Sequence, residues 1–213
     1  MNISSHITRL TELGYFQYVP EKRLADAQAS MHRSLAAGTT LEDAAEDSDL
    51  GRSLSWRQYA VDSENLCEGE LGEYLMHCKE VLALEGVQLE TVADEMRNDR
   101  NDYIVQVNGE EIIIYTERFP TEDCWGMSYI RLLVIMNTLL ERAGSTTRAY
   151  GFGRGNDTHI FLLTPELFEY LQGLEGLGNE LSVPYTVTWL LSHYLFSWNP
   201  LILHPEVGVD SLG

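Results

Sequence analysis

The sequence predicts an α+β fold, a single domain over residues 1–213 in which helices pack on a mostly antiparallel sheet of about five to six strands. Two observations support this prediction. Segments with helical periodicity alternate along the chain with short β-rich segments, and two glycine-containing turns each join a pair of β-rich segments. The 213 residues, of which 44% are hydrophobic, are enough to bury a core.

The first helix is expected over residues 20–37. Pro20 suits the first turn of a helix, apolar residues recur at helical spacing from Leu24 onward, and Gly38 can end the helix. The acidic segment 39–52 follows. We interpret it as a mobile loop or a solvated short helix, because a run of charged residues has little apolar surface to bury.

A strand is expected over residues 53–61, where apolar and polar residues alternate, and Asp62 or Ser63 can cap the helix that follows. Gly86 is expected to end this helix, and residues 87–92 to form another strand. The buried side of the helix is expected to consist of Leu71, Tyr74, Leu75, Cys78 and Leu82.

The clearest local signal is a β-hairpin over residues 103–115. Asn108 and Gly109 can adopt the positive φ angles of a type I′ turn, and β-forming residues flank them on both sides. Residues 112–114 are apolar on both faces of their strand. We therefore expect this strand to lie in the centre of its sheet.

Residues 123–142 are strongly apolar and predict a long helix that ends at Gly144. Because the helix is apolar nearly all round, we expect it to be the central helix of the core. A second hairpin is expected from residues 147–152 and 158–163, and Thr164 can cap a short helix after it. A last helix is expected over the apolar residues 182–196, which end the predicted order of elements.

The charge balance is strongly acidic. The chain has 14 Lys and Arg against 33 Asp and Glu, which gives a net charge of −19. An excess of carboxylates repels phosphate groups, so we expect no direct binding to nucleic acid or to an anionic membrane. Ten of the acidic residues lie between Glu42 and Glu73, where only Arg52 and Arg57 oppose them.

The three cysteines are too few for a disulfide framework, and the first residues lack the basic and apolar segments of a signal peptide. We therefore expect a reducing, cytoplasmic location. The sequence leaves the oligomeric state open.

No motif predicts catalysis, a cofactor or a metal. The glycine-rich segment 151–157 is interpreted as a hairpin turn and not as a phosphate-binding loop, because β-like sequence follows it where a helix would be needed. Cys67, His77 and Cys78 match no zinc-binding spacing, and packing of a helix face explains them. We expect neither a metal nor a cofactor, and we assign no catalytic residue.

The leading hypothesis is a non-catalytic acidic binding protein that neutralises a basic protein partner. An immunity protein or antitoxin that blocks the active cleft of a toxin would be an example. Clustered carboxylates steer the approach of a cationic partner and suit recognition of Arg and Lys. The predicted partner-binding residues are Glu42, Asp43, Glu46, Asp47, Asp49, Glu64, Glu68, Glu70 and Glu73.

Two alternatives stay open. Asp157 and His159 are two residues apart, which places them on the same face of a strand, and a carboxylate that orients an imidazole is half of a hydrolase site. The chain would then be a small cytosolic hydrolase. The other alternative is an oligomeric scaffold protein, for which an exposed apolar patch over residues 185–198 would be the sign.

Overall fold

The computed structural model describes residues 2–42, 51–97, 102–116, 124–153, 155–174, 181–182, 184–186 and 188. These residues form an α+β fold with antiparallel strand pairing, as the sequence predicts. The expectation of one sheet of five to six strands is wrong, because the described strands form two sheets of three strands each.

The first sheet has the strand order β1-β6-β5. Its strands are β1 (Gln58–Asp62), β5 (Arg148–Phe152) and β6 (Asp157–Leu163). β5 and β6 form the second predicted hairpin, whereas β1 pairs with β6 across a long stretch of sequence, so that Asp62 lies opposite Asp157. β1 begins later than the predicted strand 53–61. Trp56 has a positive φ of 61°, which interrupts the extended chain before β1.

The second sheet has the order β2-β3-β4 and consists of β2 (Val92–Arg97), β3 (Asp102–Val107) and β4 (Glu110–Tyr115). The predicted hairpin is confirmed, with φ angles of 51° at Asn108 and 85° at Gly109. β4 lies at an edge of this sheet and β3 in its centre, so the central position expected for residues 112–114 is wrong. Their apolar character has another cause, which is that α6 (Cys124–Arg142) packs on β4.

The predicted strand over residues 87–92 begins only at Val92. The side chain of Asn108 holds the residues before it. Its Oδ1 accepts the N–H groups of Glu90 and Thr91 at 2.8 and 3.2 Å, and its Nδ2 donates to the carbonyl of Gln88 at 2.7 Å. These bonds replace strand pairing in the connection.

Neighbouring groups bond to both edge strands of the first sheet. Beside β1, the carbonyl of Gly51 accepts an N–H of the strand at 3.4 Å. Beside β5, the amide side chain of Asn137 bonds to both backbone groups of Ala149, and the N–H of Ser182 donates to the carbonyl of Gly151 at 2.8 Å. A strand that is already bonded on both sides does not recruit another.

The remaining helices are α1 (Ile3–Glu12), η1 (Glu21–Arg23), α2 (Leu24–Ala36), α3 (Ser63–Asn65), the π-helical turn η2 (Leu66–Glu70), α4 (Leu71–His77), α5 (Lys79–Leu84) and α7 (Pro165–Gln172). α1 has no counterpart among the predicted elements. The helix predicted between Asp62 and Gly86 is divided, and its sharpest break is Gly69, whose φ is 114°. Its five predicted core residues are all buried.

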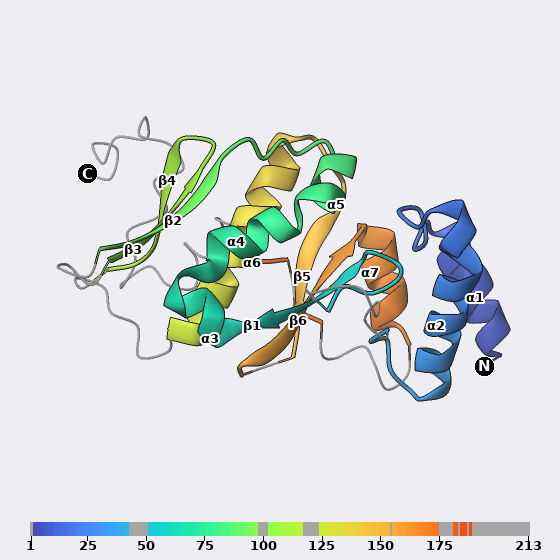
Figure 1. Ribbon diagram of the computed structural model, residues 1–213. Coiled ribbons are helices and arrows are strands. Elements are labelled where there is room, and N and C mark those ends of the chain that lie inside the picture. Colours follow the sequence, from blue (N-terminus) through green and yellow to red (C-terminus); the bar gives the residue numbers. More distant parts are fainter. Residues whose placement is uncertain are drawn as a thin grey trace.

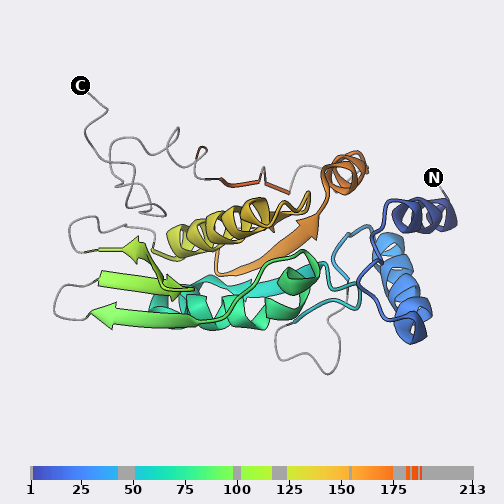
Figure 2. The same ribbon diagram turned by 90° about the horizontal axis from the view of Figure 1, so that it is seen from above.

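The helices and strands form three groups along the length of the molecule. Figures 1 and 2 show α1 and α2 at one end and β2–β4 at the other, with the first sheet and α6 between them. α6 is buried on more than one side, as predicted, and packs on β4, β5, α3, η2 and α4. No helix among the described residues is both long and apolar enough to cross a lipid bilayer.

Arg57 ties the N-terminal segment to the first sheet. Its side chain is completely buried, and the guanidinium donates to the carbonyls of Tyr15, Leu162 and Gly14 at 2.9, 2.7 and 2.8 Å. The guanidinium carbon also lies 4.4 Å from the centre of the Tyr18 ring. Burial lowers the pKa of Arg57, although a guanidinium stays charged in proteins.

Two predicted segments lie mostly outside the described residues. Of the acidic loop 39–52, residues 43–50 are not described, and of the last helix 182–196, residues 183, 187 and 189–196 are not described. Both stay predictions, as does the single domain over residues 1–213.

We expect Gly72→Ala to lower the free energy of unfolding by about 1–3 kcal/mol through overpacking. A Cβ at this position would lie 2.7 Å from a carboxylate oxygen of Asp94. Asp94 cannot move away without losing bonds, because it accepts the N–H groups of Gly72 and Glu73 and the hydroxyl of Tyr103. Urea denaturation of the two proteins measures this difference. Equal midpoints would show that Asp94 is not held as described.

Candidate functional site

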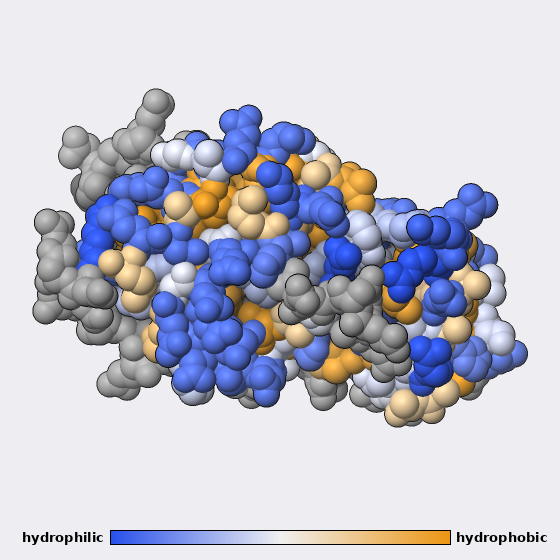
Figure 3. Space-filling view, viewed as in Figure 1, coloured by the Kyte–Doolittle hydropathy of each residue, from blue (hydrophilic) through white to orange (hydrophobic). Residues whose placement is uncertain are grey.

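An acidic cavity of about 400 Å³ opens where β1 and β6 meet the helices α3 and α4. Four carboxylates and two imidazoles line it, and no Lys or Arg is among its lining residues. The acidic residues and histidines of the lining are Asp62, Glu70, Glu73, His77, Asp157 and His159. Figure 3 shows that hydrophilic side chains cover most of the surface around α3 and α4.

Strand pairing creates one half of the cavity. Asp62 ends β1 and Asp157 begins β6, and the register places these two acidic residues directly opposite each other. Like charges in opposed positions on neighbouring strands destabilise a sheet. Two residues further along β6, His159 lies opposite the small residue Ala60, which leaves space in front of the imidazole.

Local hydrogen bonds fix Asp62 and the turn before β6 at this end of the sheet. One carboxylate oxygen of Asp62 accepts the N–H groups of Glu64 and Asn65 at 3.0 and 3.2 Å and so caps α3, as predicted. Asn156, just before β6, accepts the N–H groups of Ser63 and Glu64 through its backbone and side-chain oxygens. The turn before β6 is therefore tied to the beginning of α3.

The helices supply the other half. The positive φ of Gly69 turns the chain between η2 and α4, so that Glu70 and Glu73 both line the cavity. His77 follows Glu73 by one helical turn, and its Nε2 lies 3.9 Å from the Glu73 carboxylate. The hydroxyl of Tyr74 donates to the carbonyl of Ala60 at 2.9 Å and holds α4 against β1. Burial raises the pKa of Tyr74 well above its usual value, so this donor stays neutral.

The imidazole of His159 lies in a partly buried environment at the strand side of the cavity. Burial lowers its pKa below 6.5, and the negative charge of Asp157 opposes this shift only in part. The ring stands edge-on to that of Phe152, with 6.3 Å between the centroids, and the backbone carbonyl accepts the hydroxyl of Tyr129 at 2.6 Å. Near neutral pH the cavity therefore contains a neutral imidazole at this position.

The lowered pKa of His159 predicts a pH dependence of stability. The unfolded chain takes up this proton first as the pH falls below about 6.5, so the free energy of unfolding should decrease as the pH is lowered through that range. His159→Gln removes this contribution. We expect the variant to lose less stability than the wild type between pH 8 and pH values below 6.5, as measured by urea denaturation. Parallel pH profiles would contradict the assignment.

The structure brings only part of the predicted partner-binding set together. Glu70 and Glu73 line the cavity, whereas Glu64 and Glu68 belong to the same helical segment but not to the lining. Glu42 is only 8% exposed and accepts the hydroxyl of Tyr15 at 3.0 Å, so we leave it out of the proposed binding surface. The other four predicted residues, Asp43, Glu46, Asp47 and Asp49, lie outside the described residues.

Asp157 and His159, the pair behind the hydrolase alternative, line the same cavity as Glu70 and Glu73. The sequence analysis did not assign Asp62 or His77 to any site. His77 could have been found from its helical spacing to Glu73. Asp62 could not, because its position opposite Asp157 depends on the pairing of β1 with β6.

The lining carboxylates make recognition of cations one chemistry that is open to this cavity. Its lining hydroxyls are engaged: that of Thr158 lies 3.5 Å from the carbonyl of Val61, and that of Tyr74 donates to a backbone carbonyl. Across the described residues, no group of three or more His, Cys, Asp or Glu is arranged to hold a metal ion. Four carboxylates in a lining that contains no Lys or Arg suit the guanidinium of Arg or the ammonium of Lys.

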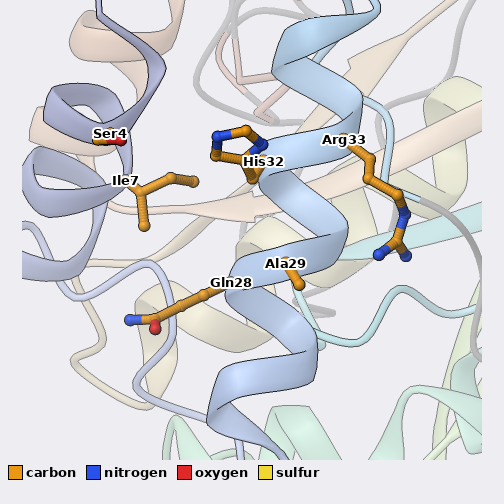
Figure 4. A pocket seen from close by; sticks show the side chains of 6 residues that line it. All are labelled: Ser4, Ile7, Gln28, Ala29, His32 and Arg33. Atoms are coloured by element: carbon orange, nitrogen blue, oxygen red, sulfur yellow. The ribbon is translucent and has the colours of Figure 1, made fainter.

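A second cavity, of about 470 Å³, lies between α1 and α2 and has a different character. It is lined by Ser4 and Ile7 of α1 and by Gln28, Ala29, His32 and Arg33 of α2, with no carboxylate among them. Figure 4 shows Ile7 and His32 close together between the helices, while Arg33 points to the other side of α2. This cavity therefore differs from the first one, because no acidic side chain lines it.

Comparisons with protein-family models, with curated proteins and with solved structures found no match to this chain.

Proposed function

We propose that this protein is a non-catalytic acidic binding protein that neutralises a basic protein partner. An immunity protein or antitoxin that blocks the active cleft of a toxin would be an example of such a protein. The observation that carries the proposal is the cavity with four lining carboxylates and no lining Lys or Arg. The strand register supports it further, because Asp62 and Asp157 lie opposite each other and a cation bound between two like charges would offset their repulsion.

The mechanism has two stages. The net charge of −19 attracts a basic partner over a distance and raises the rate of encounter, an effect that salt screens. The cavity then receives an Arg or Lys side chain of the partner between the helical carboxylates and the strand carboxylates. Occlusion of the partner's active cleft by the surrounding surface completes the neutralisation.

A titration with a hexa-arginine peptide tests where cations bind. The side-chain NMR signals of His77 and His159, which line the cavity from opposite halves, report on its occupancy. We expect both signals to shift with a common dissociation constant, and to shift little when a hexaglutamate peptide is added as a control. If the arginine peptide binds without moving either signal, cations bind elsewhere and the proposal fails.

The hydrolase alternative has one specific observation in its favour, which is that Asp157 and His159 line one cavity together. Substitution separates the two functions. In a hydrolase, His159→Gln would abolish turnover of a panel of ester, amide and phosphodiester substrates by the wild type. In a binding protein the wild type turns over none of them, and the variant keeps its affinity for cations within a few-fold.

The scaffold alternative concerns residues 185–198, most of which lie outside the described residues. It predicts a concentration-dependent oligomer in solution, which analytical ultracentrifugation detects. A monomer over the full concentration range would exclude it.

A further inference from the structure

Met96 in β2 carries a thioether that solvent can reach. Met96 is 41% exposed, and Met76 in α4 is 36% exposed. The other methionines of the described residues, Met31, Met127 and Met136, are buried. A hydroperoxide oxidises an accessible thioether to a sulfoxide. Met96 and Met76 are therefore the two described methionines that are open to this reaction.

The side chain of Met96 lies against the point where η2 changes direction. A Cβ at Gly69 would lie 3.3 Å from the Cγ of Met96 and 3.7 Å from its Sδ. The elements that carry the two residues are also in contact, since β2 packs on η2. Gly69 has a φ of 114° and precedes Glu70, which lines the acidic cavity. Met96 thus packs on the segment that brings Glu70 to the cavity.

Tyr115, the last residue of β4, joins Met96 to the same segment. Its hydroxyl oxygen lies 3.7 Å from the sulfur of Met96, and the hydroxyl donates to the backbone carbonyl of Cys67 in η2 at 2.9 Å. Burial raises the pKa of Tyr115 to about 12, so the hydroxyl keeps its hydrogen near neutral pH. Because a thioether sulfur is a weak acceptor, this one hydrogen is given mainly to the carbonyl of Cys67.

We propose that Met96 is a methionine oxidation site whose sulfoxide takes the hydrogen bond of Tyr115 away from the carbonyl of Cys67. The reagent class is a hydroperoxide. The modification is independent of the proposed binding of a basic partner, because neither Met96 nor Tyr115 belongs to the lining of the acidic cavity.

The oxidation needs no reagent besides the peroxide. A lone pair of the Met96 sulfur attacks one peroxide oxygen and forms the S–O bond, while the O–O bond breaks. The other oxygen leaves with the electron pair of that bond and takes up the proton of the first oxygen. With hydrogen peroxide the products are the sulfoxide and water. The sulfur has lost two electrons, and the peroxide has gained them.

The sulfoxide changes the acceptor that Tyr115 prefers. Its oxygen is polar, whereas the thioether sulfur accepts hydrogen bonds only weakly. An oxygen added on the side of the sulfur that faces Tyr115 comes within hydrogen-bond distance, because the hydroxyl already lies 3.7 Å from the sulfur. The hydroxyl has one hydrogen to give, so the carbonyl of Cys67 loses it. η2 then loses a tie to β4 in the turn that leads to Glu70.

The test uses the full-length protein with an isotope label at the carbonyl carbons of its cysteines. After treatment with hydrogen peroxide, peptide mapping by mass spectrometry should find one added oxygen on Met96. A carbonyl carbon resonates further upfield when its oxygen loses a hydrogen bond. We therefore expect the NMR signal of Cys67 to move upfield on oxidation and to return after treatment with methionine sulfoxide reductases. Tyr115→Phe marks the position of this signal without the bond, and oxidation should not move it further.

Met76→Leu and Met96→Leu are matched variants that each keep one exposed methionine. Met76→Leu should show the same shift as the wild type, and Met96→Leu should show none. An unmoved Cys67 signal in wild type that carries oxygen on Met96, or the same shift in Met96→Leu, would overturn the proposal. So would a Met96 that stays unoxidised while Met76 is fully converted. If Tyr115→Phe fails to fold, the wild type and the two methionine variants still decide.

Discussion

Replacing Arg57 with methionine is expected to lower the free energy of unfolding by about 4 kcal/mol, the largest effect of any single substitution that we predict. The side chain is completely buried and bonds to three backbone carbonyls, on Gly14, Tyr15 and Leu162. Hydrogen bonds to a charged donor contribute more than neutral ones, and methionine leaves these acceptors without the donor that the fold provides.

Urea denaturation measures the effect, and Arg52→Met is the matched control. Arg52 stacks on Trp56 at 4.1 Å and pairs with Glu80 at 3.2 Å, where the carboxylate is largely exposed. Pairs of this kind contribute about 1 kcal/mol or less. If both substitutions cost the same, the guanidinium of Arg57 does not hold the N-terminal segment to the sheet.

The second large effect is expected from the cavity. The triple variant Glu70→Gln, Glu73→Gln, Asp157→Asn should bind a hexa-arginine peptide at least about tenfold more weakly than the wild type at low salt. Its free energy of unfolding should rise, because the repulsion between Asp157 and Asp62 is removed. Gain of stability with loss of binding is the combination expected of a site that is built for a ligand.

A matched control separates the cavity from the overall charge. Glu90→Gln, Glu141→Gln, Glu169→Gln also removes three negative charges, all from exposed positions outside the cavity lining. We expect this control to keep most of the affinity of the wild type. An equal loss of affinity in the two variants would mean that binding of the peptide depends on net charge alone.

Sequence reasoning succeeded where structure is local. The turn at Asn108 and Gly109, the cap at Thr164 and the long apolar helix α6 each depend on a few neighbouring residues, and all three are confirmed. Asp62 as a helix cap is of the same kind. Each of these signals lies within a single element or turn of the chain.

Sequence reasoning failed where residues far away in the sequence determine the environment of a strand. The apolar residues 112–114 predict a central strand, but their cover comes from α6 and not from a second neighbouring strand. At the edge of β5, the backbone groups of Ala149 bond to the side chain of Asn137, which comes from another element. Nothing in the local sequence signals such a contact.

The candidate site was likewise predictable from the sequence only in part. The sequence showed that acidic residues are dense before Glu73, and it singled out Asp157 and His159 for a separate reason. That both groups line one cavity follows from the pairing of β1 with β6, which periodicity cannot predict. Charge alone also misplaced Glu42, because an acidic residue beside an acidic run is expected on the surface, whereas Tyr15 binds it in the interior.

The most direct test of the central claim, that the acidic cavity binds a basic protein, is affinity capture from the native cell lysate. The wild type, the cavity triple variant and the control triple variant serve as parallel baits, each eluted with a salt gradient. We expect one basic protein that is retained in equal molar amount by the wild type and by the control variant, elutes at high salt, and is lost from the cavity variant. Retention of no basic protein by the wild type at low salt, or equal retention by all three baits, would contradict it.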